Sequence, residues 1–216
     1  MLKYYLVLGI LLIQQSVLLG QYRATEWADR DHWQNTEVIL KNLDLSPGMA
    51  VADIGCHEGY LTMKLSPVVG DRGKVMAVDV EQYKLNKLAR RLKQQNIINV
   101  KTILGDYDDP KLPLNSLDAV VILDAYHEMD DYQKILKHVY RALKPGGRLV
   151  MVEPIAKSRL QWTRKKQAGK HEIAMRYVLT DLKQAGFAIR SKKDPFIDRP
   201  SKNDRMWIAV AVKPKS

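Results

Sequence analysis

The sequence predicts an α/β fold in which a doubly wound sheet of seven strands is mostly parallel and ends in an antiparallel C-terminal hairpin. Two observations predict this class. Short β-branched runs alternate with helical segments, which is typical of a parallel sheet covered on both faces. Two more apolar runs lie close together near the end of the chain, at 186–190 and 205–212, as an antiparallel pair would. With 216 residues, 46% of them hydrophobic, the chain is long enough for one sizeable domain.

The other elements follow from local patterns along the chain. The first helix begins at Asn35, a capping residue, and its apolar residues recur at helical spacing up to Leu43. A Ser-Pro-Gly turn at 46–48 separates this helix from the first strand. Further helices are expected at about 58–67, 83–95, 130–143 and 172–185. Strands are expected at about 49–54, 74–79, 98–103, 118–123 and 147–153.

The most informative stretch is residues 51–60, with the sequence VADIGCHEGY. An apolar strand ends at Asp53, a turn runs from Gly55 to Gly59, and a helix follows. This arrangement brings backbone N–H groups and a helix N-terminus against a ligand. The spacing is Asp-x-Gly-x-x-x-Gly, whereas nicotinamide-binding proteins use Gly-x-Gly-x-x-Gly, so a nicotinamide dehydrogenase is disfavoured.

Acidic residues follow the next strands at regular places. Asp79 ends the second strand, 26 residues after Asp53, where Rossmann-like folds bind a ribose through its hydroxyls. Charge-assisted hydrogen bonds of this kind contribute roughly 1.5–3 kcal/mol each. A Gly-Asp-Tyr turn at 105–107 follows the third strand and Asp124 follows the fourth. A Leu-Lys-Pro-Gly-Gly turn at 143–147 precedes the fifth strand. Because the carboxyl ends of parallel strands share one edge of a sheet, these acids are expected at one rim.

These five elements resemble the motifs of the class I S-adenosylmethionine (SAM)-dependent methyltransferases, most clearly over residues 35–155. The usual first motif of that family is Asp-x-Gly-x-Gly-x-Gly, and His57 stands at its middle glycine. The resemblance implies a Rossmann-like fold, SAM as the cofactor and a cofactor site at the rim. In that site the first motif lines the methionine part, Asp79 holds the ribose and the 105–107 turn borders the adenine. The expected cofactor-binding residues are Asp53, Gly55, His57, Gly59, Asp79, Asp106, Tyr107 and Asp124.

The segment Asp-Ala-Tyr-His-Glu at 124–128 lies where methyltransferases of this class build their substrate side. His127 is a candidate general base and Tyr126 a candidate for orienting the acceptor. The alternative is that His127 and its neighbour only cap the next helix. His171 and Glu172 could close over the same pocket. A metal site using Asp124, Glu153, His127 or His171 is conceivable from their oxygen and nitrogen donors. No spacing here matches a defined metal motif, so no metal site is expected.

The first functional hypothesis is a SAM-dependent methyltransferase for a small-molecule acceptor, similar to the group that includes quinone methyltransferases. The net charge of +11 suggests a second hypothesis, a methyltransferase that acts on RNA or protein. Residues 157–216 contain 16 Lys and Arg against 5 Asp and Glu, while residues 1–156 are balanced. This region could recruit RNA or a protein for methylation, and Trp162 could stack a base. It lacks a recognisable nucleic-acid motif, so a solvated loop is favoured. A third hypothesis is a non-catalytic SAM-binding module, because His57 replaces a glycine.

The N-terminal segment resembles a leader. A basic start at 1–3 precedes ten apolar residues at 4–13, with Gly20 before a plausible cleavage point. Ten residues are too few for a transmembrane helix, which needs about 20, but fit the apolar core of a signal peptide. We therefore expect a signal peptide at 1–20, a methyltransferase domain at 21–216 and export to the periplasm or the exterior. An uncleaved anchor at 4–20 and a buried helix are the alternatives. The single cysteine, Cys56, permits no internal disulfide.

Overall fold

A computed structural model of the chain describes residues 27–215. The expected leader at 1–20, with its cleavage or anchoring, lies outside the described residues. Within the described range, none of the helices combines the length and apolar character needed to cross a bilayer.

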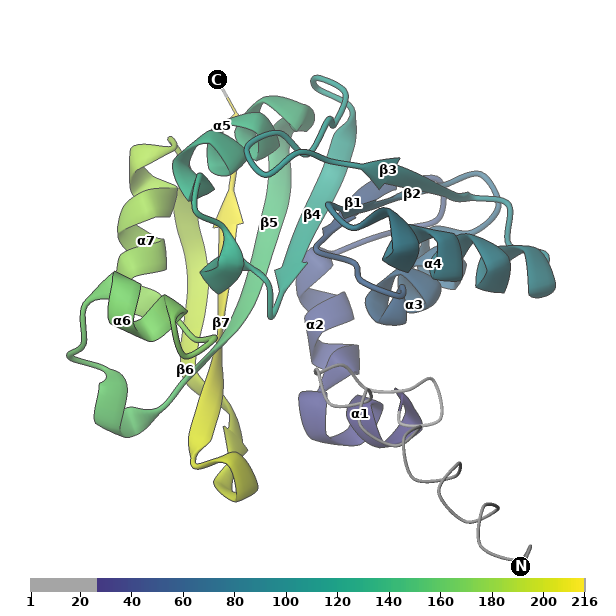
Figure 1. Cartoon of the computed structure of the whole chain (residues 1–216). Coiled ribbons are helices and arrows are strands. Elements are labelled where there is room, and N and C mark those ends of the chain that lie inside the picture. The colour runs from purple at the N-terminus through teal and green to yellow at the C-terminus, as the bar shows by residue number, and fades with distance from the viewer. Residues whose placement is uncertain (1–26, 216) are drawn as a thin grey trace, which may run out of the picture.

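The core of the protein is one seven-stranded sheet with the order β3-β2-β1-β4-β5-β7-β6 (Figure 1). Strands β1 to β5 are parallel, and β7 runs antiparallel between β5 and β6. The predicted fold class is therefore confirmed, including the antiparallel hairpin. The strands are β1 Ala50–Ile54, β2 Lys74–Asp79, β3 Val100–Leu104, β4 Leu117–Leu123, β5 Leu143–Ile155, β6 Ala188–Arg199 and β7 Asp204–Val212.

The strand order reverses between β1 and β4, and this reversal positions the site. From β1 the chain moves outward through β2 to β3 and then returns to the other side of β1 as β4. In open parallel sheets a crevice forms at such a reversal, beyond the carboxyl ends of the strands. Asp53 lies next to it, paired in register with Ala77 on one side and Val121 on the other.

Helices cover both faces of the sheet, which explains the nearly continuous apolar strands. On one face, Ile39 of α2 and Leu65 of α3 belong to one buried cluster with Val75 and Val121. On the other, α5 and α7 pack against residues such as Met151. The helices are α1 Trp27–Gln34, α2 Thr36–Leu43, α3 Tyr60–Val69, α4 Gln82–Gln94, α5 Tyr132–Ala142, α6 Arg164–Ala168 and α7 Met175–Gln184. Short 3₁₀ turns are η2 Tyr126–Glu128, η3 Lys157–Arg159 and η4 Pro200–Lys202.

Four elements differ from the sequence prediction. Strand β5 already begins at Leu143, so the residues of the expected turn at 143–147 belong to the strand. Helix α1 forms before the first predicted helix, and α6 forms in the expected basic loop. Strand β6 continues to Arg199 instead of ending near 190. It is an edge strand paired only with β7, and most of its side chains are exposed, including Lys192 and Lys193. Charged residues are common on such edges because they oppose pairing with other chains, so no apolar pattern marks the strand.

Candidate functional site

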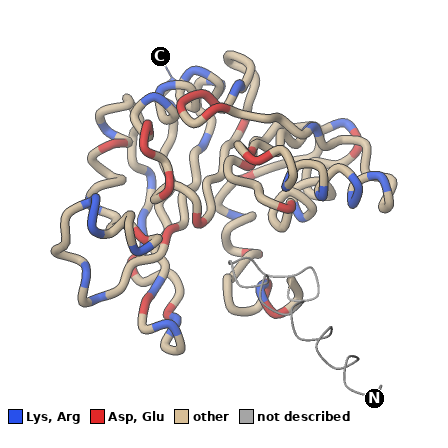
Figure 2. Tube along the Cα trace, in the orientation of Figure 1, with Lys and Arg blue, Asp and Glu red and all other residues tan. Residues whose placement is uncertain are grey.

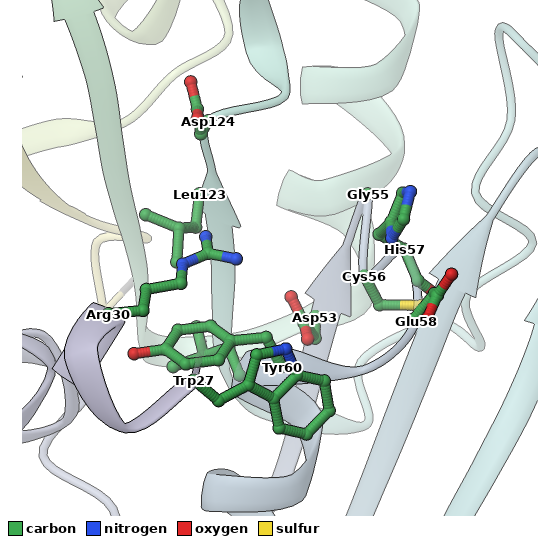
Figure 3. A pocket seen from close by; sticks show the side chains of 11 residues that line it. Trp27, Arg30, Asp53, Gly55, Cys56, His57, Glu58, Tyr60, Leu123 and Asp124 are labelled. Atoms are coloured by element: carbon green, nitrogen blue, oxygen red, sulfur yellow. The ribbon is translucent and has the colours of Figure 1, made fainter. Parts of the chain in front are cut away.

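The tip of β1 opens into a small cavity of about 60 Å³, here called the Asp53 cavity (Figure 3). Its walls come from α1, the β1–α3 loop, the start of α3 and the end of β4. The lining residues are Trp27, Arg30, Asp53, Gly55, Cys56, His57, Glu58, Tyr60, Leu61, Leu123 and Asp124. Four predicted cofactor residues thus meet here, although they come from positions up to 71 residues apart in the chain.

Asp53 is 2% exposed and accepts a hydrogen bond from Thr62 Oγ1 at 2.6 Å. Burial dominates its electrostatics and raises the pKa of the carboxyl to about 6, although the Thr62 hydrogen bond and the nearby Arg30 charge oppose this. The Arg30 guanidinium lies 4.0 Å from the centre of the Tyr60 ring, on the wall opposite the strand tip (Figure 3). The cavity therefore presents the Arg30 guanidinium and the buried Asp53 carboxylate, with the carboxylates of Glu58 and Asp124 also in its lining.

The loop after β1 needs left-handed backbone at three positions. The φ angles of Gly55, His57 and Gly59 are 74°, 51° and 88°. A Cβ at Gly55 would lie 2.5 Å from the Ala125 Cβ, so a side chain there would collide with the loop after β4. His57 holds a conformation that glycine adopts at lower cost, which explains why a glycine suits this place.

Gly59 does not line the Asp53 cavity. A Cβ at this position would meet Leu88 Cδ1 of α4 at 2.3 Å. The glycine is therefore needed where α3 begins and α4 packs against it. The structure gives Gly59 a packing role in place of the predicted ligand contact.

A second cavity of about 250 Å³ lies beyond β2, here called the Asp79 cavity. It shares Gly55, His57 and Asp124 with the Asp53 cavity, so the two adjoin at the strand reversal. Its lining residues are Ile54, Gly55, His57, Val78, Asp79, Val80, Glu81, Lys84, Asp106, Tyr107, Pro110, Asp124, Ala125, Glu128, Met129 and Ile135. All the predicted cofactor residues except Gly59 therefore line one or both cavities.

Two backbone N–H groups, one from the β1–α3 loop and one from just after β2, hold the Asp79 carboxylate. Its Oδ2 accepts the His57 N–H at 2.8 Å and its Oδ1 accepts the Glu81 N–H at 3.0 Å. A carboxylate has about four acceptor positions, so two remain for a ligand. The side chain is 7% exposed and faces the cavity. The hydrogen bond to His57 also ties the first motif to the second strand.

The remaining predicted cofactor residues differ in exposure. Tyr107 is 76% exposed, and the Asp106 carboxylate forms an ion pair with Lys111 at 3.0 Å. Asp124 lies where the two cavities meet and has a left-handed backbone with φ 55°. Burial, followed by repulsion from Glu153, raises the pKa of its carboxyl.

The two predicted catalytic residues, Tyr126 and His127, lie outside these two cavities, and each forms a hydrogen bond with a buried carboxylate. His127 Nδ1 is 2.6 Å from Glu153 Oε2, and both side chains are buried. Burial alone would lower the pKa of His127, but the carboxylates of Glu153, Glu128 and Asp124 together outweigh it and raise the pKa to about 10. The general-base role of His127 stays a prediction. The Tyr126 hydroxyl is buried and donates to Asp181 Oδ2 at 2.9 Å, so it does not present itself to an acceptor.

His127 instead forms part of a third hollow of about 650 Å³, here called the His127 cavity. Its lining residues are Tyr126, His127, Glu128, Met129, Asp130, Tyr132, Arg164, Lys165, Ala168, Gly169, His171 and Ile173. Glu128 and Met129 also line the Asp79 cavity, so the two hollows are neighbours. His171 does face this pocket, as the sequence suggested, while Glu172 points inward and accepts the Ala156 N–H at 2.8 Å.

Sequence reasoning missed Trp27, Arg30 and Lys84 as cavity residues. The first two lie on α1, and only their spacing within an aromatic, polar stretch could have suggested a helix facing the site. Lys84 lies in the first turn of α4 and pairs with Glu81, a local pattern that carries no sign of a cavity.

Figure 2 shows Lys and Arg residues along the connection around α6, and several of them contact other parts of the protein. Arg159 pairs with buried Glu172 at 3.0 Å, and Arg164 pairs with Asp181. Arg176 donates to the Trp162 carbonyl at 2.9 Å. Lys165 and Lys166 are exposed. Much of the positive charge therefore serves the packing of the β5–α7 connection.

Comparisons with known proteins agree with this geometry. Residues 51–147 match the family described as a methyltransferase domain. A demethylmenaquinone methyltransferase of Geobacillus sp. (strain WCH70) is 31% identical over 124 residues, which are 57% of this chain and 53% of that protein. The ubiquinone/menaquinone biosynthesis C-methyltransferase UbiE of Vibrio campbellii (strain ATCC BAA-1116) is 34% identical over 108 residues, 50% of this chain and 42% of that protein. The chain spans about half the length of the curated relatives it matches.

The fold extends beyond the matched segment. The crystal structure of a SAM-dependent methyltransferase from Aquifex aeolicus has a TM-score of 0.70 at 22% identity, covering 89% of this chain and 99% of that one. The matched residues run from β1 into β5 and include Asp53, Asp79 and Asp124. Residues 51–147 therefore resemble a methyltransferase domain, and the described part of the chain has the fold of SAM-dependent methyltransferases, as its motifs predicted.

Proposed function

We propose that the protein is a SAM-dependent methyltransferase that acts on a small-molecule acceptor. The observation that carries this proposal is the pair of adjoining cavities at the strand reversal. They join through Gly55, His57 and Asp124, and each holds one buried carboxylate from a strand tip. Such a crevice suits a nucleoside with an attached amino acid, because it offers separate polar groups at its two ends.

The residues present fit SAM. Asp79 has acceptor capacity left for the ribose hydroxyls, and Tyr107 and Asp106 border the Asp79 cavity on the adenine side. At the other end, the Asp53 carboxylate and the Arg30 guanidinium are placed to meet the ammonium and carboxylate of an amino acid.

The chemistry makes modest demands on the chain. SAM supplies the methyl group and its own leaving group when bound. The protein has to align an acceptor with the methyl group and exclude water, and it needs no nucleophile of its own. The buried walls at Leu123 and Ala125 serve the second requirement. The His127 ring is fixed by Glu153 through Nδ1 and lines the neighbouring hollow.

A hydroquinone is the acceptor class to test first, because both relatives named above act in quinone biosynthesis by their names. The His127 cavity has aromatic and cationic walls, including Tyr132 and Arg164, whose guanidinium lies 4.0 Å from the Tyr132 ring centre. Such walls suit a small ring that carries ionisable hydroxyls. RNA or protein methylation is less well supported, since Arg159, Arg164 and Arg176 each form an ion pair or a hydrogen bond with another part of the protein.

The decisive experiment measures transfer of a labelled methyl group from SAM by the full chain. A hydroquinone without its ring methyl group and total RNA are offered in parallel. We expect label in the hydroquinone and none above background in RNA. Label in RNA alone would show that the acceptor is RNA and not a hydroquinone. SAM binding without transfer to either would favour the non-catalytic module.

Export is a separate proposal, tested by fractionation of the native protein with N-terminal sequencing, which finds Gln21 first if residues 1–20 are removed.

A further inference from the structure

Three metal-ligating side chains that are separate in the sequence meet at the edge of the His127 cavity. His127 and Glu128 come from η2, and His171 comes from the connection between α6 and α7. One donor atom from each lies within 4.8 Å of the other two. The 43-residue separation between Glu128 and His171 hides the group from any motif search, because the fold alone brings the connection back to η2.

The spacing of the donor atoms suits a tetrahedral ion. Glu128 Oε1 lies 3.7 Å from His127 Nε2 and 3.3 Å from His171 Nδ1. Metal–ligand bonds of about 2.0–2.1 Å at tetrahedral angles place neighbouring donors ~3.3 Å apart. The His127 and His171 rings meet edge to face, with centroids 5.9 Å apart and an interplanar angle of 82°. Only small side-chain shifts are needed to close the group around one ion.

His127 is oriented as metal-binding histidines are. Its other ring nitrogen, Nδ1, bonds to buried Glu153, which leaves Nε2 directed toward Glu128 and the cavity. A carboxylate behind a ligating histidine fixes the ring and its tautomer and increases its basicity. Glu153 is itself fixed, because its Oε1 accepts the N–H groups of Ala125 at 2.8 Å and Tyr126 at 2.6 Å.

The segment that carries His171 is also anchored. Its neighbour Glu172 is 3% exposed and binds the Ala156 N–H and Arg159 at the end of β5. The His171 side chain itself remains 78% exposed, so its backbone is anchored while its ring lies beside Glu128 at the protein surface.

A second group of possible ligands, Asp124, His127 and Glu153, fits a metal less well. It would use His127 Nδ1, whose place is already taken by Glu153 at 2.6 Å. Glu153 is 0% exposed and accepts three hydrogen bonds from the protein, so an ion would have to displace them. The outer group keeps these bonds intact.

We propose that His127, Glu128 and His171 bind one divalent transition-metal ion, with zinc the first choice. Two imidazoles and one carboxylate are a ligand set typical of zinc and of other borderline divalent metals. Three protein ligands leave a fourth position open toward the His127 cavity, where water or the oxygen of a small molecule binds. This site goes beyond methyl transfer and does not depend on SAM binding.

The test titrates zinc chloride into the full chain after metal has been stripped with a chelator and the chelator removed. Calorimetry should show one ion per chain. His171→Ala and Glu128→Gln should each weaken binding at least tenfold, because each removes one ligand. Both side chains are more than 60% exposed, so these variants should fold, which circular dichroism checks. Cobalt in place of zinc should give visible absorption of four-coordinate intensity in the unchanged protein and lose it in both variants.

The matched control is His138→Ala. His138 of α5 also faces a carboxylate, Asp109, at 3.4 Å, but lies outside the proposed site. Its zinc affinity should stay within twofold of the unchanged protein. The proposal is overturned if the unchanged protein binds no stoichiometric zinc, or if the two site variants bind as tightly as His138→Ala does. In the second case the zinc sits elsewhere, and the three side chains form ion pairs only.

Discussion

Buried carboxylates occur in both halves of the sheet, but they are used differently. In the half built on β1 and β2, Asp53 and Asp79 face cavities and accept one and two of the hydrogen bonds described above. In the half built on β5, Glu153 accepts three hydrogen bonds and is 0% exposed, and Glu172 is bound by a backbone N–H and by Arg159.

This difference distinguishes carboxylates that can bind a ligand from carboxylates that only stabilise the fold. A carboxylate whose acceptor positions are filled by the protein stabilises the fold and cannot bind a ligand without losing those bonds. A carboxylate with acceptor positions left at a cavity wall carries a desolvation penalty that a ligand can relieve. Position at a strand tip is therefore not enough to assign a role. Glu153 sits at the same rim as Asp79 but serves to hold the loop after β4.

The largest effect should come from Glu153→Ala. This change leaves the His127 imidazolium buried without its partner and two backbone N–H groups without an acceptor, so it should destabilise the fold by about 3–5 kcal/mol. Chemical denaturation measures the loss of stability.

Asp53→Asn is the matched comparison for Glu153→Ala. Because burial disfavours its charged form, removing that charge should leave stability at pH 7 unchanged or raised. Equal losses in the two variants would erase the distinction between the halves.

Asp79→Ala should weaken SAM binding at least tenfold, or about 1.4 kcal/mol, because it removes the proposed ribose acceptor. Calorimetry on the folded variant measures it. Asp71→Ala removes an exposed acid away from both cavities and should leave the affinity within twofold. An unchanged affinity in Asp79→Ala would show that the ribose lies elsewhere.

The pKa of about 6 at Asp53 predicts a pH dependence with opposite signs for binding and stability. As the pH falls from 7 to 5 the carboxyl is neutralised, and the affinity for SAM should drop about tenfold. The contribution of this group to stability is full below its unfolded pKa of 3.8 and is lost as the pH rises through about 6. Calorimetry at both pH values tests the first part. The drop should vanish in Asp53→Asn, and a drop that persists there would assign the effect to another group.

The smallest effect is expected for His57→Gly. Glycine removes the left-handed strain at φ 51° and clears a side chain from the wall shared by both cavities. We expect SAM to bind a few times more tightly, as equilibrium titration would show. Weaker binding would mean that the imidazole contacts the cofactor and that the departure from the family motif is useful.

The sequence predicted the sheet and the cofactor rim because both depend on local patterns. A strand that ends in an acid and is followed by a glycine turn places Asp53 and Asp79 without knowledge of the rest of the chain. The partners of side chains were not predictable in this way. Gly59 looked like a ligand contact, but its neighbour Leu88 comes from α4. His127 was predicted to be a base, but its contact with Glu153, 2.6 Å away, could not be predicted from the sequence. Arg30 and His171 reach their sites only through the arrangement of α1 and of the α6–α7 connection.

The account rests on SAM lying across the carboxyl ends of β1, β2 and β3, and calorimetry of the full chain with SAM tests this most directly. We expect a saturable heat that fits one molecule per chain, lost or at least tenfold weaker in Asp79→Ala. No measurable heat of binding at millimolar SAM, with the protein folded by circular dichroism, would contradict the account.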